Sequence, residues 1–226
     1  MLSYIRNEIV FIEKSINEQT TRMEIFERCR ILGLTDFGLL ILGMPNPEFP
    51  KISKILPRMA SEEVQKSWTG SSGSTLLAQT LDFVRSLSYN YTKYTGNTLE
   101  ARKILDFGCG YGRIARLMYY FTSEDNFHAM DPWDKSLEIC NQDGLTKNFL
   151  LSDYLPLTLP AEEKSFDLIF AFSVFTHLSE RAIRTNLNTI SKYIKPDGLI
   201  VITIRPVEYW DIDAHAIKGG GGRGDS

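Results

Sequence analysis

Between residues 103 and 204, short apolar segments alternate with helical patterns, and this alternation limits the fold more than any other feature of the chain. The apolar segments have the length and composition of buried strands, which we expect at residues 103–107, 126–131, 148–151, 165–172 and 199–204. The intervening patterns predict helices at residues 113–121, 134–141 and 180–194, and a turn at residues 195–198. Strands that alternate with helices form a parallel sheet covered on both faces. We therefore predict an α/β fold with a doubly wound sheet and a ligand crevice beyond the carboxyl ends of its first and fourth strands.

The residues before this sheet carry a different pattern, which predicts a helical extension. Apolar side chains recur every three or four residues over residues 4–32, so we expect one long helix that Gly33 ends. Four prolines predict an irregular connection over residues 36–57, with a helical turn at residues 52–56. Two more helices are expected, one after Ser61 and one that Ser74 caps and that ends near residue 95. The predicted units are an extension at residues 1–98, a core at residues 99–217 and a flexible glycine-rich tail at residues 218–226.

Composition argues against several classes of partner. The hydrophobic fraction is 43% and the charged fraction 23%, as in ordinary globular proteins. A net charge of −3 does not favour nucleic acid or a membrane surface as a partner. No apolar run is long enough to span a bilayer, and charged residues interrupt the apolar pattern at the N-terminus. The three cysteines are too far apart for a disulfide framework or a zinc site, so we expect a cytoplasmic protein without a metal centre.

The glycine-rich segment at residues 104–112, ILDFGCGYG, is the strongest candidate for chemistry. Here a strand that carries Asp106 runs into a turn that opens a helix. Gly108, Gly110 and Gly112 would let backbone N–H groups approach a bound ligand, because no Cβ stands in the way. The same residues are also compatible with a tight strand-to-helix turn that binds nothing.

Polar residues follow the next three strands. Asp131 ends the second strand beside the glycine turn, where a carboxylate can accept both hydroxyls of a ribose. Asp153 follows the third strand and can address an adenine edge, whereas His177 reaches the crevice from the fourth strand. Each residue has a structural alternative: a helix cap or turn for Asp131, a turn for Asp153 and a hydrogen-bonded structural histidine for His177.

The segments KILDFGCGYGR, AMDPWD, LLSDYLPLTLP, SFDLIFAFSVFTHL and IKPDGLIVIT occur in this order over residues 102–205. Their order and spacing resemble the class I S-adenosylmethionine-dependent methyltransferases. The resemblance implies a Rossmann-like sheet of strand order 3-2-1-4-5, S-adenosylmethionine as the cofactor and methyl transfer as the reaction. The sheet of this family usually has seven strands, and the 226-residue chain leaves no room for the last two. The fifth strand would then be an exposed edge. We expect either a truncated chain or an edge that residues 205–216 or a second copy in a homo-oligomer would cover.

The resemblance also assigns residues to parts of the cofactor. Asp106 and the three glycines would hold the methionine part, and Asp131 the ribose. The adenine would lie near four further residues, namely Pro132, Trp133, Asp153 and Tyr154. Phe172 and Ser173 would lie close to the methyl group.

A segment of the extension resembles the region that precedes the core in some bacterial members of the family. Trp68, Thr69 and Gly70 would fold over the cofactor. The N–H groups at the start of the following helix would meet its carboxylate, because helix N-termini attract anions. The alternative is an ordinary helix cap beside a core tryptophan.

Methyl transfer mainly requires that the acceptor atom and the methyl group be held in line. A base is needed only for a protonated, weakly acidic acceptor, and His177 is the first candidate, before Asp211 and His215. No Asn/Asp-Pro-Pro-Tyr segment follows the fourth strand, which favours a small-molecule or glycan acceptor over nucleic-acid bases.

Two other functions are compatible with parts of this sequence. A nicotinamide-dependent oxidoreductase would explain the Tyr-x-x-x-Lys pair of Tyr89 and Lys93. That pair precedes the glycine turn, however, and the turn lacks the third glycine of the GxGxxG pattern. The second alternative is a non-catalytic binding module on the methyltransferase fold.

Overall fold

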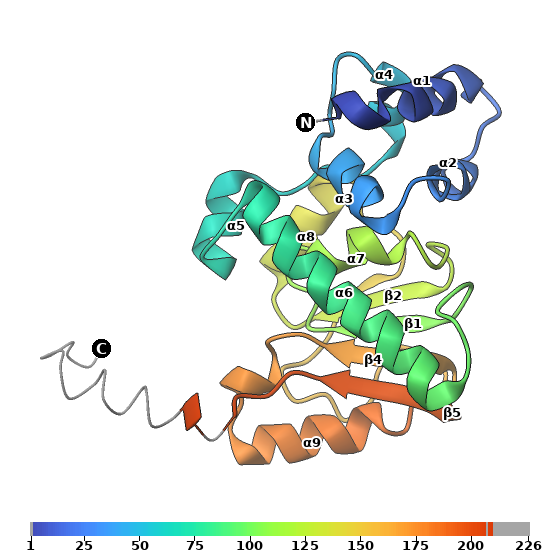
Figure 1. Ribbon diagram of the computed structural model, residues 1–226. Coiled ribbons are helices and arrows are strands. Elements are labelled where there is room, and N and C mark those ends of the chain that lie inside the picture. The colour runs from blue at the N-terminus through green and yellow to red at the C-terminus, as the bar shows by residue number, and fades with distance from the viewer. Residues whose placement is uncertain (1, 207, 210–226) are drawn as a thin grey trace, which may run out of the picture.

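The computed structural model describes residues 2–206 and 208–209 (Figure 1). Within them, five parallel strands form one sheet of order β3-β2-β1-β4-β5. The strands are β1 (Ile104–Phe107), β2 (Phe127–Asp131), β3 (Phe149–Leu151), β4 (Phe166–Ala171) and β5 (Ile194–Ile202). The predicted α/β, Rossmann-like sheet and its strand order are confirmed.

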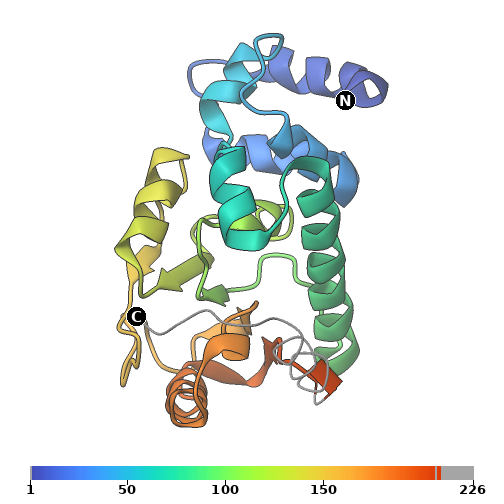
Figure 2. The ribbon, with the colours of Figure 1, turned by 90° about the vertical axis from the view of Figure 1, so that its left-hand side faces the viewer.

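The two faces of the sheet bury different apolar side chains, because side chains alternate along a strand. Ile104 of β1 belongs to the cluster on the side of α6, α7 and α8, whereas Leu105 belongs to the cluster under α9. These helices are α6 (Gly73–Thr95), α7 (Arg113–Met118), α8 (Asp134–Gln142) and α9 (Glu180–Ile190). Figure 1 shows α6 crossing in front of the strands and α9 below them, and in Figure 2, turned by 90°, α6 runs vertically while α9 is seen nearly end-on.

The prediction of one long helix over residues 4–32 is wrong, because residues 16–21 are not helical. A 3-10 turn, η1 (Ser3–Ile5), leads into α1 (Arg6–Ser15), and α2 (Arg22–Cys29) follows the break. Thr21 starts α2 with a capping box: its hydroxyl accepts from the Glu24 N–H, and the Glu24 carboxylate accepts from the Thr21 N–H. The apolar periodicity continues across the break, so periodicity alone did not reveal it.

Residues 34–42 form a helix where the sequence predicted an irregular connection. This helix, α3 (Leu34–Leu42), precedes the short α4 (Pro50–Ile55), which is close to the predicted turn. A Cβ on Gly38 would lie 3.0 Å from Leu77 and 3.2 Å from Leu117. The glycine therefore permits α3 to pack closely on α6 and α7, and does not break the helix.

The remaining helices largely match their predictions. Ser61 caps α5 (Glu62–Thr69) by accepting from the Val64 N–H. The next helix, α6, begins at Gly73, so the predicted cap at Ser74 is wrong. The predicted turn at residues 195–198 lies inside β5, as a bulge between the pairs Phe166–Ile194 and Leu168–Leu199.

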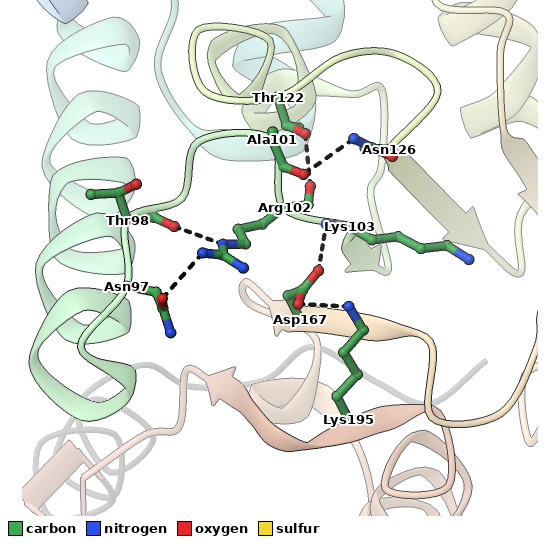
Figure 3. Close-up of polar contacts among 9 residues, drawn as sticks. All are labelled: Asn97, Thr98, Ala101, Arg102, Lys103, Thr122, Asn126, Asp167 and Lys195. Carbon is green, nitrogen blue, oxygen red and sulfur yellow. Dashed lines mark hydrogen bonds and ion pairs between the residues drawn. The ribbon is translucent and has the colours of Figure 1, made fainter.

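Polar contacts hold the strands together at their amino ends, opposite the crevice (Figure 3). Asp167 of β4 accepts from the Lys103 N–H at 2.8 Å and from the Lys195 ammonium at 2.7 Å. The Thr122 hydroxyl donates to the Arg102 carbonyl at 2.7 Å. These bonds tie the starts of β1, β4 and β5 together and leave the carboxyl ends of the strands for the site.

Among the described residues, β5 is the last strand of the sheet and pairs with β4 alone. The predicted cover by residues 205–216, the candidates Asp211 and His215, and the tail at residues 218–226 fall wholly or mostly outside the described residues. The helices α1–α4 share one apolar cluster with α6 and α7, and the division at residues 98 and 217 stays a prediction. No helix in the described part of the chain has both the length and the apolar character needed to cross a membrane.

Candidate functional site

The glycine turn after β1 has the backbone shape that only glycines adopt without strain. Gly108, Gly110 and Gly112 have φ values of +84°, +54° and +73°. The N–H groups of Gly108 and Cys109 donate to the Met130 carbonyl of β2, at 2.8 and 3.0 Å. The turn is therefore fixed against the neighbouring strand before any ligand binds.

The carboxylate of Asp131 holds the same turn from the end of β2. One of its oxygens accepts from the Gly110 N–H at 2.8 Å and the other from the Trp133 N–H at 3.0 Å. Each carboxylate oxygen has further lone pairs, so these bonds still leave acceptor capacity for hydroxyl groups. Asp131 thus combines a structural role with the position predicted for a ribose ligand.

Asp106 is buried at the end of β1, with 1% of its surface exposed. Its Oδ2 atom has no hydrogen-bond partner among the described residues. Burial raises the pKa of this carboxyl well above its usual value, and the nearby charge of Asp131 raises it further, while Arg113 opposes both effects. An unpartnered buried carboxyl is costly, and such groups concentrate at functional sites.

Arg113, the first residue of α7, was missed by the sequence analysis. Its guanidinium lies over the Phe172 ring, 4.9 Å from the ring centroid. Burial lowers the pKa of this group, with Tyr111 and Asp106 opposing the effect. The only available signal was a basic residue directly after the glycine turn.

Aromatic rings cover the outer side of the turn. Trp68 of α5 stacks on Trp133, with centroids 4.8 Å apart and planes at 21°, and meets the edge of Tyr111 at 5.6 Å. A Cβ on Gly110 would lie 3.9 Å from the Trp68 ring. The extension therefore places a tryptophan beside the glycine turn, and its predicted contact with the cofactor stays a prediction.

The buried side chain of Arg116 explains how the extension is held there. It donates to the Arg58 carbonyl at 2.7 Å, to the Tyr111 carbonyl at 2.6 Å and to the Asp143 carboxylate at 3.2 Å. One guanidinium thus joins the segment before α5, the glycine turn and the end of α8.

These elements enclose a cavity of about 400 Å³, a size typical of small-molecule sites. Eight of the predicted site residues line it: Trp68, Thr69, Asp106, Gly108, Gly110, Phe172, Ser173 and His177. Five lining residues were not predicted: Gln79, Cys109, Tyr111, Arg113 and Ile114. The cavity is open to a ligand that spans the glycine turn and the end of β4.

Seven predicted residues do not line this cavity: Gly70, Gly112, Asp131, Pro132, Trp133, Asp153 and Tyr154. A Cβ on Gly112 would lie 2.4 Å from Leu145, so this glycine serves close packing against the segment after α8. Asp153 is exposed, and 71% of the Tyr154 surface is exposed. Their assignment to the adenine stays a prediction.

His177 connects this cavity to a second one. Its short helix, η2 (Phe175–His177), follows β4, and its side chain is exposed. The second cavity, of about 520 Å³, is lined by Phe175, Thr176, His177, Leu178, Ser179, Ile183, Ile204 and Arg205. Ser173, on the wall of the first cavity, has a φ of +60°, and its N–H donates to the Thr203 hydroxyl at 2.7 Å.

The start of α6 does not reach the first cavity, contrary to the expectation for a carboxylate site. Gly73 lines a different cavity, and its N–H donates to the Gln65 side chain at 3.0 Å. Gln79, in the second turn of α6, reaches the first cavity instead. No cluster of three or more His, Cys, Asp or Glu side chains suited to a metal ion occurs within residues 2–206 and 208–209.

Comparison with known proteins shows which families this segment is similar to. Residues 104–198 match the model of a methyltransferase domain. A malonyl-[acyl-carrier protein] O-methyltransferase from Brevibacillus brevis is 29% identical over 143 residues, which cover 59% of this chain and 50% of the relative. The chain therefore spans about half the length of that curated relative.

Solved structures show the same fold. The plantazolicin methyltransferase BpumL in complex with SAH has a TM-score of 0.50 and 16% identity, covering 95% of this chain and 67% of that one. BpumL in complex with a pentazolic desmethylPZN analog and SAH has a TM-score of 0.50 and 17% identity. That match covers 84% of this chain and 66% of the BpumL chain.

The parallel sheet, its strand order and the glycine turn define a Rossmann-like, cofactor-binding class of protein. The family match covers residues 104–198, and it agrees with the resemblance of this segment to the class I S-adenosylmethionine-dependent methyltransferases.

Proposed function

We propose that this protein transfers the methyl group of S-adenosylmethionine to a small organic acceptor. The observation that carries the proposal is the pair of carboxylates, Asp106 and Asp131, at adjacent strand ends around the glycine turn. Asp131 would accept from the two ribose hydroxyls, and the unpartnered oxygen of Asp106 would face the part of the cofactor that carries positive charge. A nicotinamide cofactor offers no cation at that position to match Asp106.

The cofactor supplies an activated methyl group, and the chain supplies position and shielding. When bound, the cofactor would give up its methyl group to the acceptor lone pair while the carbon–sulfur electron pair returns to sulfur, which would leave S-adenosylhomocysteine. Trp68 and Phe172, which both line the cavity, would exclude water from the reacting atoms. The acceptor approaches from the second cavity, and His177, where the two cavities meet, takes its proton when the acceptor is weakly acidic.

The proposed acceptor is a small molecule, with a glycan or a peptide as the alternatives to be tested. The second cavity has apolar walls from Leu178, Ile183 and Ile204, which suit an acceptor with an apolar body. The relatives support this size class, because one is named for a malonyl group on an acyl carrier protein and the other for plantazolicin.

Calorimetry with S-adenosylmethionine, S-adenosylhomocysteine and NAD tests the cofactor. We expect the two sulfur compounds to bind and NAD not to bind. Asp131→Ala should weaken binding by about 1.5–3 kcal/mol for each charged hydrogen bond lost, while the exposed neighbour Asp134→Ala serves as the matched control. Failure of the wild-type chain to bind S-adenosylmethionine would refute the proposal.

A transfer assay with radiolabelled S-adenosylmethionine then tests catalysis. Pools of small carboxylic acids, phenols and amines, of glycans and of peptides would be compared for label uptake. Label in the first pool supports the proposal. Cofactor binding with no transfer to any pool would instead support the non-catalytic binding module.

A further inference from the structure

Arg113 is a cation inside the cofactor cavity without a matching anion. Its side chain lines the cavity, and its one close contact there is the face of the Phe172 ring. Among the described residues, no atom accepts a hydrogen bond from the guanidinium, and no carboxylate forms an ion pair with it within 4.0 Å. A partly buried cation of this kind gains from any ligand that brings an anion.

The second observation is the opposite charge on the same cavity wall. The Oδ2 atom of Asp106 is fully buried and unpartnered, and Asp106 and Arg113 act on each other through space. A carboxyl and a guanidinium, neither with a hydrogen-bond partner in the described part of the chain, are therefore available to a ligand that lies between the glycine turn and Phe172. The amino-acid end of S-adenosylmethionine is a zwitterion with one ammonium and one carboxylate, and it matches this arrangement.

Other groups near the cavity fit the carboxylate less well. Arg113 is the single arginine or lysine among the described lining residues, and Gln79 carries no charge. The first N–H of α6, on Gly73, already donates to Gln65 and lines a small neighbouring cavity that Arg113 also borders. Arg116 is committed to three acceptors of its own.

We infer that Arg113 binds the α-carboxylate of the cofactor through a charge-assisted hydrogen-bonded pair and makes the pocket selective for ligands with the complete amino-acid end. This inference rests on the proposed function. Arg113 would face the carboxylate and Asp106 the ammonium, which fixes the direction of the methionine chain along the turn. The Phe172 ring would support the guanidinium from below by cation–π contact.

A ligand series that removes the amino-acid end in steps tests the inference. S-adenosylhomocysteine has both charges, S-adenosylthiopropylamine lacks only the carboxylate, and methylthioadenosine lacks both. Each is titrated by calorimetry into the wild-type chain and into Arg113→Met, which keeps most of the side-chain length and removes the charge. Arg184→Met, at an exposed position on α9, is the matched control.

We expect Arg113→Met to weaken the binding of S-adenosylhomocysteine about 10- to 150-fold. This factor corresponds to about 1.5–3 kcal/mol for a charged hydrogen-bonded contact. Binding of S-adenosylthiopropylamine and of methylthioadenosine should change less than about threefold on the same scale. Arg113→Lys keeps the charge without the paired geometry and should show an intermediate loss. Retained methylthioadenosine binding proves that each variant is folded.

If Arg113→Met weakened the binding of all three ligands equally, the inference would be overturned, because Arg113 would then support the pocket as a whole. Unchanged binding of all three would overturn it as well, while leaving the proposed function intact. Should the Met variant not fold, the Lys variant decides between these outcomes with the same ligands. If the wild-type chain binds none of the three, the proposed function and the inference fail together.

Discussion

Replacement of Asp106 by Asn should stabilise the cofactor-free protein and weaken cofactor binding. The carboxyl is 1% exposed and one of its oxygens has no partner, so its ionised form is unfavourable in the empty protein. Asn keeps the size and one acceptor oxygen but removes the charge. A buried ionised group costs more than a neutral amide of the same shape, and we expect a gain of about 1–3 kcal/mol from removal of the charge. At about 2–4 °C per kcal/mol for a chain of this size, the melting temperature should rise by roughly 2–12 °C.

The pH dependence of this gain has a defined sign. Burial, and then the charge of Asp131, raise the folded-state pKa of Asp106 above its unfolded value, with Arg113 in opposition. The folded protein therefore holds a proton that the unfolded chain releases, and it loses stability as pH rises from the unfolded to the folded pKa. The advantage of Asp106→Asn should be absent near pH 4 and increase as the pH rises. By the same linkage, cofactor affinity of the wild-type chain should increase with pH over this range.

Thermal denaturation of the cofactor-free protein at several pH values measures the effect, and calorimetry with S-adenosylhomocysteine measures the loss of binding. Asp197→Asn, at an exposed position in the β5 bulge, is the matched control and should change neither quantity. A less stable Asp106→Asn protein at neutral pH would refute the reasoning, because the carboxylate would then have a stabilising partner in the empty state.

Three further substitutions test the glycine turn, the tryptophan that covers it and the carboxylate partner of Arg116. Gly108→Ala should destabilise the protein by about 1–3 kcal/mol in chemical denaturation, because φ is +84° and the new Cβ would lie 2.3 Å from Val174; an unchanged midpoint would contradict this. Trp68→Ala should raise the Kd for S-adenosylmethionine about 2- to 10-fold by calorimetry, the equivalent of one aromatic contact, and an unchanged Kd would remove this tryptophan from the cofactor cover. Asp143→Ala leaves the buried Arg116 without its carboxylate and should cost about 3 kcal/mol of unfolding free energy, whereas a neutral effect would show that the two carbonyl acceptors suffice.

Several features of the site were predictable because they depend on short stretches of chain. Asp106 and Asp131 end adjacent parallel strands, and the carboxyl ends of parallel strands meet at one sheet edge. The glycine turn was predictable because a positive φ at three alternate positions favours glycine. Asp153 met the same criterion, yet it is exposed and outside the cavity, because its position depends on the path of the chain after β3.

Other features could not be predicted because they arise from contacts between distant segments. The helix at Leu34–Leu42 looked irregular because Gly38 and nearby prolines weaken it locally. Its stability comes from close packing on α6 and α7, which the missing Cβ permits. Arg113 looked like an ordinary first-turn residue. Only its position near Phe172 and Asp106 in the folded chain indicates that it could bind a ligand.

The sequence by itself determined the parallel sheet, its strand order and the two carboxylates beside a glycine turn, because local periodicity and backbone preference encode them. Tertiary structure decided which of these groups are left without partners. Whether a buried charge is matched depends on what distant segments bring near it, as Arg116 is matched by Asp143 and Arg113 is not matched by any described carboxylate. The unmatched charges of Asp106 and Arg113 are therefore a product of the folded chain, and no single segment of the sequence specifies them.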